Sequence, residues 1–247
     1  GCETIWLVCN DDIAPLIRYR VGDYVVDPVS LNRMSRFPSH ERVQIPIFYV
    51  PIHPKDRDKR DCLSWSVIHG ALASLKVSTT ISKWLIPDKY YVSFPYGVFP
   101  VEELRPKRKL ISNSKNFYVA SKGRTAMENF YCSFTFGKDE FIKYRRNIRK
   151  KGTGMYTMDV VDERGIPRHK LPVEQRYSAR FFELSDVFTD LDLDEATVFE
   201  PSDFANVSSW REYRDYISSD LPDKIIRPWK GIMAYREFNP IGVDLGE

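Results

Sequence analysis

Strict alternation of apolar and polar or tyrosine side chains between Phe130 and Phe136 is the sequence feature that most constrains how this chain folds. One side of the segment carries Phe130, Cys132, Phe134 and Phe136, and the other carries Tyr131, Ser133 and Thr135. A period of two residues is typical of a β-strand with one face in the core. We therefore expect a half-buried strand here.

A partner for this strand precedes it in the chain. Residues 117–120 form a second short aromatic run, and the polar segment 121–129 separates the two runs. Gly123 lies near the middle of that segment, where a tight turn favours glycine. The sequence therefore predicts a hairpin.

Composition sets limits on the fold and on the partners. The chain has 247 residues, of which 43% are hydrophobic and 14% aromatic, and this excludes a wholly disordered chain. It is long enough for one large domain, or for a smaller domain with a long extension. No run approaches the roughly 18 apolar residues of a membrane helix, so we expect no membrane partner.

The first part of the chain favours β structure. Residues 4–9 are continuously apolar and predict a buried strand. In residues 17–28, a strand approaching Gly22-Asp23 and a strand leaving it would suit the entry to a small, bent β-barrel. Residues 43–54 are aromatic and β-branched, but prolines interrupt them. Because proline cannot donate to a sheet ladder, we expect an edge strand or a strand that ends at a bulge.

The next segments alternate in character. Residues 55–61 are densely charged and predict an exposed loop or the start of a helix. Between residues 63 and 85, Trp65, Ile68, Leu72 and Leu75 follow helical spacing and predict one helix. The aromatic segment 89–99 predicts an extended strand. The expected fold class is mainly β with some α, as a bent barrel or sheet core.

Charge divides the chain into a basic middle and an acidic tail. Residues 101–151 hold fourteen basic and five acidic side chains, a net charge of +9. Residues 183–223 hold two basic and twelve acidic side chains, a net charge of −10. The segment between them contains glycines and polar residues typical of a linker. We therefore expect a β-rich domain over 1–151, and over 152–247 an extension or small acidic subdomain that packs on it.

The segment from Lys138 to Lys151 is the main candidate binding site. It predicts a helix on which Arg145 and Arg149, and likewise Arg146 and Lys150, are four residues apart and share a side. Such a stripe would suit nucleic-acid phosphate. The alternative is a solvated face that pairs with the acidic tail. The candidate residues for nucleosome or nucleic-acid binding are Lys143, Arg145, Arg146, Arg149, Lys150 and Lys151.

Catalytic and metal signatures are absent from the sequence. The four cysteines form no CxxC pair, and the four histidines form no HxH or HExxH pattern. The acidic run 190–195 lacks the glycine and the distal glutamate of a calcium loop. We expect reduced thiols, no metal, no cofactor and no enzymatic activity.

Several segments resemble the bromo-adjacent homology (BAH) domain. They are RVGDYVV at 20–26, IFYVP at 47–51, FPVEEL at 99–104, NFYVASK at 116–122 and ENFYCSFTFGKDEF at 128–141. The resemblance covers about residues 17–150 and is most specific in the last strand. It is poor between residues 55 and 90, where this chain has additional material.

The resemblance implies a nuclear protein that docks on chromatin through histones, nucleosomal DNA or both. Some BAH domains bind methylated lysine in an aromatic cage, where a cation contacts ring faces. Aligning the aromatic strand places Ile47 where the family has a tryptophan, which argues against a complete cage. The possible histone-peptide contacts are Phe48, Tyr49 and Trp65.

Two functions therefore follow as expectations. The first is a chromatin-binding module without chemistry of its own. The second is a structural subunit of a large assembly, such as a virion or an organellar complex, in which the aromatic, proline-rich segment after Lys151 packs on neighbouring subunits. Nucleosome binding would separate them.

Overall fold

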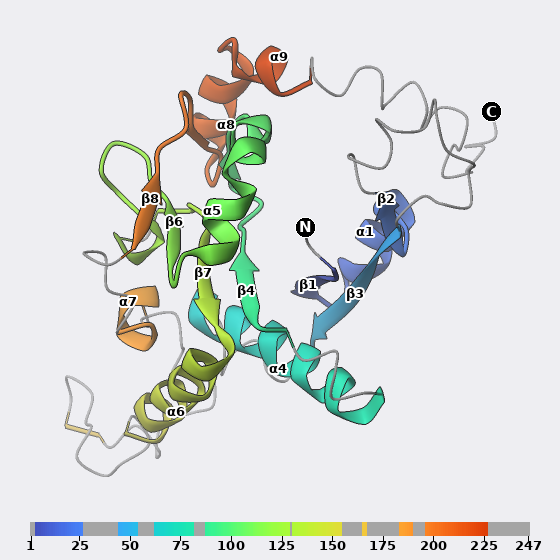
Figure 1. The fold of residues 1–247 in the computed structure, drawn as a ribbon, viewed down its shortest axis with the longest axis vertical. Coiled ribbons are helices and arrows are strands. Elements are labelled where there is room, and N and C mark those ends of the chain that lie inside the picture. Colours follow the sequence, from blue (N-terminus) through green and yellow to red (C-terminus); the bar gives the residue numbers. More distant parts are fainter. Residues whose placement is uncertain are drawn as a thin grey trace.

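The structure is a computed structural model, and it describes residues 3–26, 44–53, 62–81, 87–128, 130–154, 165–166, 183–189 and 196–226. Within these ranges the strands form three sheets, and none closes into a barrel (Figure 1). Helices make up much of the described chain: the two longest, α4 (Leu63–Ile81) and α6 (Lys138–Gly154), have 19 and 17 residues. The described fold is mixed α/β. The expectation of strands with helices is confirmed at that level, whereas the expected predominance of β structure is wrong.

The first sheet contains three strands in the order β1-β3-β2. Its strands are β1 (Ile5–Asn10), β2 (Tyr24–Val26) and β3 (Gln44–Ile52). β3 is the middle strand, so the expectation of an edge strand is wrong for the sheet as a whole. However, β2 pairs only with residues 44–46 and β1 only with residues 47–52. Pro46 and Pro51 thus each have a strand partner on one side, and their missing N–H can face the open side.

The expected strand before Gly22 is instead the helix α1 (Ala14–Val21). Pro15 lies in the first turn, where its missing N–H removes no helical bond. Gly22 ends the helix with a positive φ of 84°, and its N–H donates to the carbonyl oxygen of Arg18 at 2.8 Å. The strand expected after Gly22-Asp23 is confirmed as β2.

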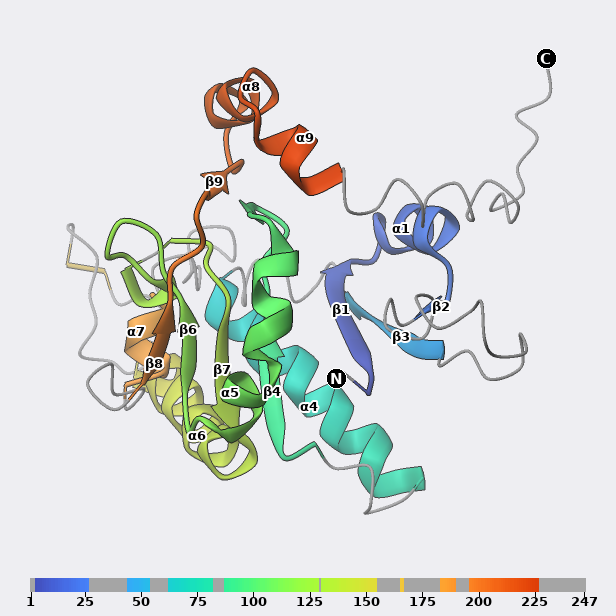
Figure 2. The same cartoon turned by 45° about the horizontal axis from the view of Figure 1, so that its top comes forward.

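Helix α4 lies between the first sheet and the second, and it confirms the helix predicted over 63–85 (Figures 1 and 2). Ile68 and Ala71 are buried in the main core, and Trp65 packs against the same core. Gly70 faces β1, where a Cβ atom would lie 2.7 Å from Cγ2 of Val8. The absent side chain at Gly70 therefore lets the helix approach the first sheet closely.

The second sheet has four strands in the order β4-β7-β6-β8. They are β4 (Lys89–Val92), β6 (Phe117–Val119), β7 (Phe134–Gly137) and β8 (Thr197–Phe199). The expected hairpin is confirmed, because β6 and β7 are antiparallel. Lys122 and Gly123 both have positive φ, 52° and 70°, as the tight hairpin turn of type I′ requires.

Strand β7 is shorter and more buried than its alternation predicts. The N–H of Cys132 donates to the carbonyl oxygen of Phe130 at 2.7 Å, so a three-residue turn precedes the strand. Phe130 and Cys132 pack with Phe117 on one face of the sheet, while Phe134 packs on the other, so the alternation breaks between Cys132 and Phe134. Thr135 is also fully buried. Both faces of the sheet are covered, so the expectation of a half-buried strand is wrong.

Each face of the second sheet has its own cover. On one face, α4, α6 and α7 (Leu184–Val187) enclose the main core. On the other, Leu104 and Ile111 pack against Phe117 and Val119. Leu104 and Ile111 come from a short helical region. A third sheet of two strands lies nearby. The helical region is η3 (Val101–Lys107) and α5 (Arg108–Asn113), and the third sheet is β5 (Gly97–Val98) with β9 (Ala205–Asn206). The short helix η4 (Ala126–Glu128) packs instead on the main core through Ala126.

The described part of the acidic tail is joined to the rest of the fold. β8 is a strand of the second sheet, and Leu184 and Val187 are buried in the main core. The tail then forms α8 (Trp210–Ile217) and α9 (Leu221–Ile226). The predicted helix cap is confirmed at Ser209, whose side chain accepts from the N–H of Glu212. The division at residue 151 stays a prediction, and residues 55–61 and 190–195 lie outside the described ranges.

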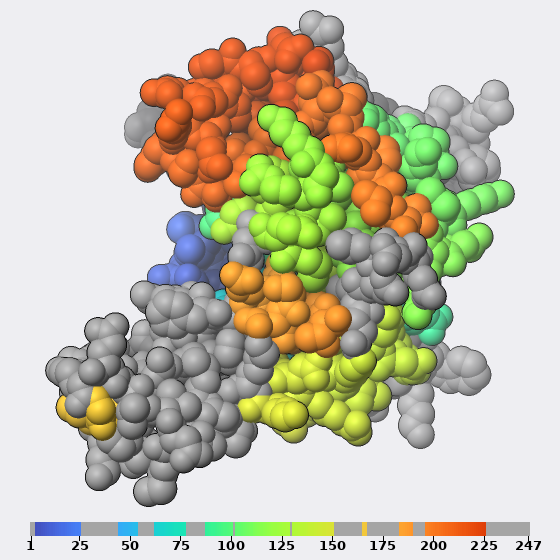
Figure 3. All heavy atoms as spheres, turned by 90° about the vertical axis from the view of Figure 1, so that its left-hand side faces the viewer, coloured from blue at the N-terminus to red at the C-terminus, as the bar shows by residue number. Residues whose placement is uncertain are grey.

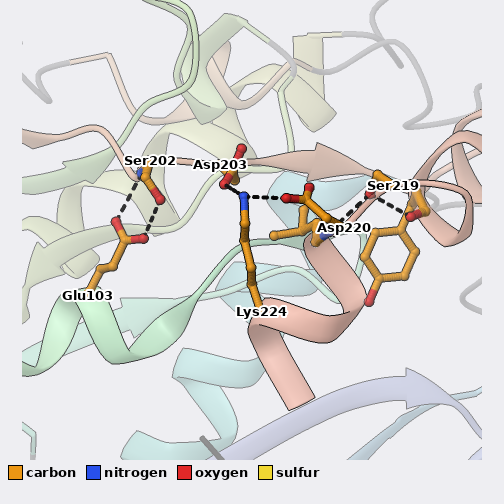
Figure 4. A network of polar contacts seen from close by, with 8 residues as sticks. Glu103, Ser202, Asp203, Ser219, Asp220 and Lys224 are labelled. Carbon is orange, nitrogen blue, oxygen red and sulfur yellow. Dashed lines mark hydrogen bonds and ion pairs between the residues drawn. The ribbon is translucent and has the colours of Figure 1, made fainter. Parts of the chain in front are cut away.

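Polar contacts fix α9 and the segment before β9 against η3 (Figure 4). The carboxylate of Glu103 accepts from the N–H of Ser202 at 3.0 Å and from its hydroxyl at 2.5 Å. Lys224 pairs with Asp203 at 2.7 Å and with Asp220 at 2.8 Å. These contacts give α8 and α9 a fixed place at one end of the molecule.

Candidate nucleic-acid interface

Helix α6 starts directly from the end of β7. The N–H of Lys138 donates to the carbonyl oxygen of Asp88 at 3.0 Å. The carboxylate of Glu140 accepts from the N–H of Gly137 at 2.7 Å, as the acidic residue of a capping box does. Asp139 and Glu140 also place negative charge in the first turn, which favours the helix dipole. The predicted helix is confirmed, and its start is well determined.

One face of α6 is held in the main core. Phe141, Tyr144 and Ile148 are almost completely buried. The ring of Tyr144 lies 4.7 Å from that of Phe188, and the amide of Asn147 donates to the carbonyl oxygen of Val187 at 3.0 Å. Each buried large side chain contributes about 2 kcal/mol through the hydrophobic effect. This burial fixes which side of the helix faces solvent.

The opposite side of α6 carries the basic face, by which we mean Lys143, Arg146, Arg149 and Lys150. All four side chains are exposed. Lys143, Arg146 and Lys150 follow the spacing i, i+3, i+7 and span about 10 Å along the helix. That length matches about three phosphates of one DNA strand, at 3.4 Å of helix axis each.

Two predicted site residues differ from the rest. Arg145 is half-buried on the flank of α6, and its Nε atom is buried without a hydrogen-bond partner in the described structure. It therefore does not join the basic face, although sequence spacing grouped it with Arg149. Lys151 lies in the last turn of α6, and its side chain is outside the described part of the chain.

The basic face and helices α8 and α9 of the acidic tail lie at opposite ends of the molecule, whereas α7 of the same tail packs beside α6. Figure 3 shows α6 (yellow-green) at one end and α8 with α9 (red) at the other, in agreement with Figure 1. The tail's carboxylates have closer partners: Asp203 and Asp220 pair with Lys224, Asp215 with Arg214, and Glu212 accepts from Ser208 and Ser209. Helices α8 and α9 therefore lend no support to the alternative that the acidic tail neutralises the basic face, which stays a prediction for the rest of the tail.

The possible histone-peptide contacts do not form one cluster. Phe48 stacks on Trp6 with ring centroids 4.4 Å apart. Tyr49, its neighbour in β3, points to the other face of the strand, where its hydroxyl donates to the carbonyl oxygen of Gly22 at 2.6 Å. Trp65 packs on the main core from α4. The structure thus places the three aromatic residues in three different environments.

Chemistry at other positions is limited in the described ranges. They contain no group of three or more His, Cys, Asp or Glu residues able to hold a metal ion. Cys9, Cys62 and Cys132 are free thiols. Burial raises the pKa of Cys132 to about 12, which keeps that thiol protonated and unreactive. No helix in the described ranges has the length and apolar character needed to cross a bilayer.

Sequence reasoning missed two exposed apolar surfaces. α8 exposes Trp210, Tyr213 and Ile217, and α1 exposes Leu16 and Tyr19. The helical spacing i, i+3, i+7 in α8 could be predicted from the sequence, but the exposure of these side chains could not.

In comparisons with protein families, with curated proteins and with solved structures, nothing matches this chain.

Proposed function

We propose that this chain is a chromatin-binding module that contacts the phosphates of nucleosomal DNA through the basic face of α6. The observation that carries the proposal is the orientation of this helix. Phe141, Tyr144 and Ile148 anchor one side in the core, so Lys143, Arg146 and Lys150 must point outward from a rigid support. A preformed row of cations binds phosphate without a cost for ordering the helix.

The proposed contact carries no base-specific chemistry. The basic face presents ammonium and guanidinium groups, which position a protein on the phosphate backbone and do not by themselves select a sequence. The resemblance of the segments around β6 and β7 to a BAH domain supports chromatin as the setting, and a nuclear location belongs to the same proposal. Histone contacts through Phe48, Tyr49 and Trp65 are not needed for it.

A shift assay with the full chain and reconstituted nucleosomes tests this function. If three phosphates are neutralised, affinity should fall about 40-fold between 50 and 200 mM salt, from a slope near −0.9 per contact. The variant Lys143→Glu, Arg146→Glu, Lys150→Glu should lose binding at both salt concentrations. Circular dichroism and thermal melting would show that this variant is folded.

The chain offers a matched control for that variant. Lys107, Arg108 and Lys109 are also exposed, but their helices cover the other face of the second sheet. Changing all three to Glu alters the net charge by the same amount. The control should keep most of the affinity. Equal losses in both variants would mean that net charge alone drives binding, and the proposed interface would be wrong.

A second candidate function is a structural subunit of a larger assembly. The exposed apolar side chains of α1 and α8 favour it, because large apolar patches on a surface commonly mark sites of protein association. This function does not involve the basic face. Self-association of the purified chain, treated next, tests it independently.

A further inference from the structure

Helix α8 presents an apolar stripe to solvent, formed by Trp210, Tyr213 and Ile217. The Trp210 side chain is 84% exposed and that of Ile217 is 52% exposed. The inner side of the helix is held by Glu212, whose carboxylate accepts from Ser208, Ser209 and Asn206. The capping box at Ser209 fixes the helix start, so the stripe is a stable feature of the surface.

Helix α1 presents a second apolar stripe, formed by Ile13, Leu16 and Tyr19. Leu16 is 66% exposed, and none of the helix's residues is fully buried. The inner side of α1 packs on β3, where Tyr49 donates to the carbonyl oxygen of Gly22. The two stripes are on different parts of the molecule, as both cartoon views show (Figures 1 and 2).

We propose that the α8 stripe of one copy docks on the α1 stripe of a second copy. Both helices have eight residues, and each places apolar side chains on about two turns of one side. Stripes of this spacing are the form in which helices pack side by side. Burial of Trp210, Leu16 and their neighbours would drive the association.

Charge selects this pairing and gives it a direction. Asp11 and Asp12 precede α1 and Arg20 lies in its last turn, whereas α8 has Arg211 in its first turn and Asp220 beyond its end. Parallel packing of the two helices brings Asp12 near Arg211, and Arg20 near Asp220, which also pairs with Lys224 of its own chain.

Area sets the strength of the contact. Each stripe offers a few hundred Å², less than the roughly 800 Å² per partner of a standard stable interface. We expect a weak contact, with a Kd on the order of 10–100 µM. Because the two stripes differ, the contact is head-to-tail, and repeated contacts give rings or open chains of copies rather than a closed dimer.

Sedimentation equilibrium of the full chain tests the proposal. The average mass of the native chain should rise with concentration through this range. The variants Leu16→Glu and Trp210→Glu should each remain monomeric. An equal mixture of the two should form one-to-one dimers, because one variant keeps a working α8 stripe and the other a working α1 stripe. Leu110→Glu, which alters an exposed apolar residue of α5, is the matched control and should associate like the native chain.

Each other result counts against the proposal. A native chain that stays monomeric throughout the range, or a mixture of the two variants that stays monomeric, overturns it. Association that only one of the two variants abolishes would indicate a different interface. Charge reversal adds a second readout: Asp12→Arg and Arg211→Asp should each weaken association, and combining them should restore it. Nucleosome binding by the monomeric variants is a separate measurement, so the two proposals can fail independently.

Discussion

Gly97 lies against the main chain at Tyr131, so closely that a Cβ atom on Gly97 would overlap the carbonyl oxygen of Tyr131. The ring of Phe204 would be 3.1 Å from the same atom. A backbone carbonyl cannot move aside as a flexible side chain can. This contact joins β5 to the turn before β7, and glycine is the residue that permits it.

Gly97→Ala should therefore destabilise the fold by about 3 kcal/mol, because the overlap forces a backbone shift in the core. Urea unfolding followed by tryptophan fluorescence would measure the change. Gly123→Asn is the control: Gly123 has positive φ but open space around it, and asparagine tolerates that conformation. A loss of less than about 1 kcal/mol for Gly97→Ala would contradict the described packing.

Lys89 holds the end of α5 against the second sheet. Its ammonium group donates to the carbonyl oxygens of Ile111 at 3.0 Å and Ser112 at 2.8 Å, and also to that of Ser114. Lys89→Met keeps the apolar part of the side chain and removes these bonds, so we expect a loss of about 2 kcal/mol. Lys109→Met, at an exposed position of the same helix, should change stability little. Equal effects of both substitutions would show that Lys89 has no special role.

Several elements were readable from sequence because local pattern and final structure agree. The helix over 63–85 has apolar residues at helical spacing, and Ser209 is a capping residue before an amphipathic run. The strand predicted in place of α1 shows where patterns conflict. Ile17, Tyr19 and Val21 alternate as in a strand, while Pro15 and Gly22 signal a helix start and stop. The positions of Pro15 and Gly22 therefore predicted the correct element, and the alternation did not.

Other features depend on contacts that no local pattern encodes. Cys132 and Phe134 are two residues apart, as on one face of a strand, yet they pack in the two cores on opposite faces of the second sheet. At the candidate site, the sequence predicted the helix, and the partner class inferred from its charge stays a prediction. The burial of Phe141, Tyr144 and Ile148 fixes the rotation of α6 about its axis. This rotation decides that Arg146 faces solvent and that Arg145 does not fully do so.

A buried thiol and a buried phenol make the stability of the fold sensitive to high pH. Burial raises the pKa of Cys132 to about 12, and it also raises the pKa of Tyr144. In the unfolded chain a thiol loses its proton near pH 8.5. Between these values the unfolded state binds fewer protons than the folded state, so stability should fall as pH rises.

Thermal melts at pH 8, 9 and 10 would measure this alkaline loss. Cys132→Val fills the site with an apolar side chain and removes the thiol, so its melting temperature should depend less on pH. Thiol labelling gives a second measurement, since Cys132 should react only when the chain unfolds. Rapid labelling of Cys132 in the native chain at pH 8 would contradict its burial.

Arg145 and Arg146 are neighbours in sequence, but they should differ in nucleosome binding. Arg146 is exposed at the centre of the basic face, whereas Arg145 lies half-buried on the flank with its Nε atom enclosed. Arg146→Gln should weaken binding and reduce the salt slope by about 1, because one phosphate contact is lost. Arg145→Gln makes the same charge change and should leave the slope nearly unchanged. If the two variants lose affinity equally, the rotation of α6 that defines the basic face does not determine binding.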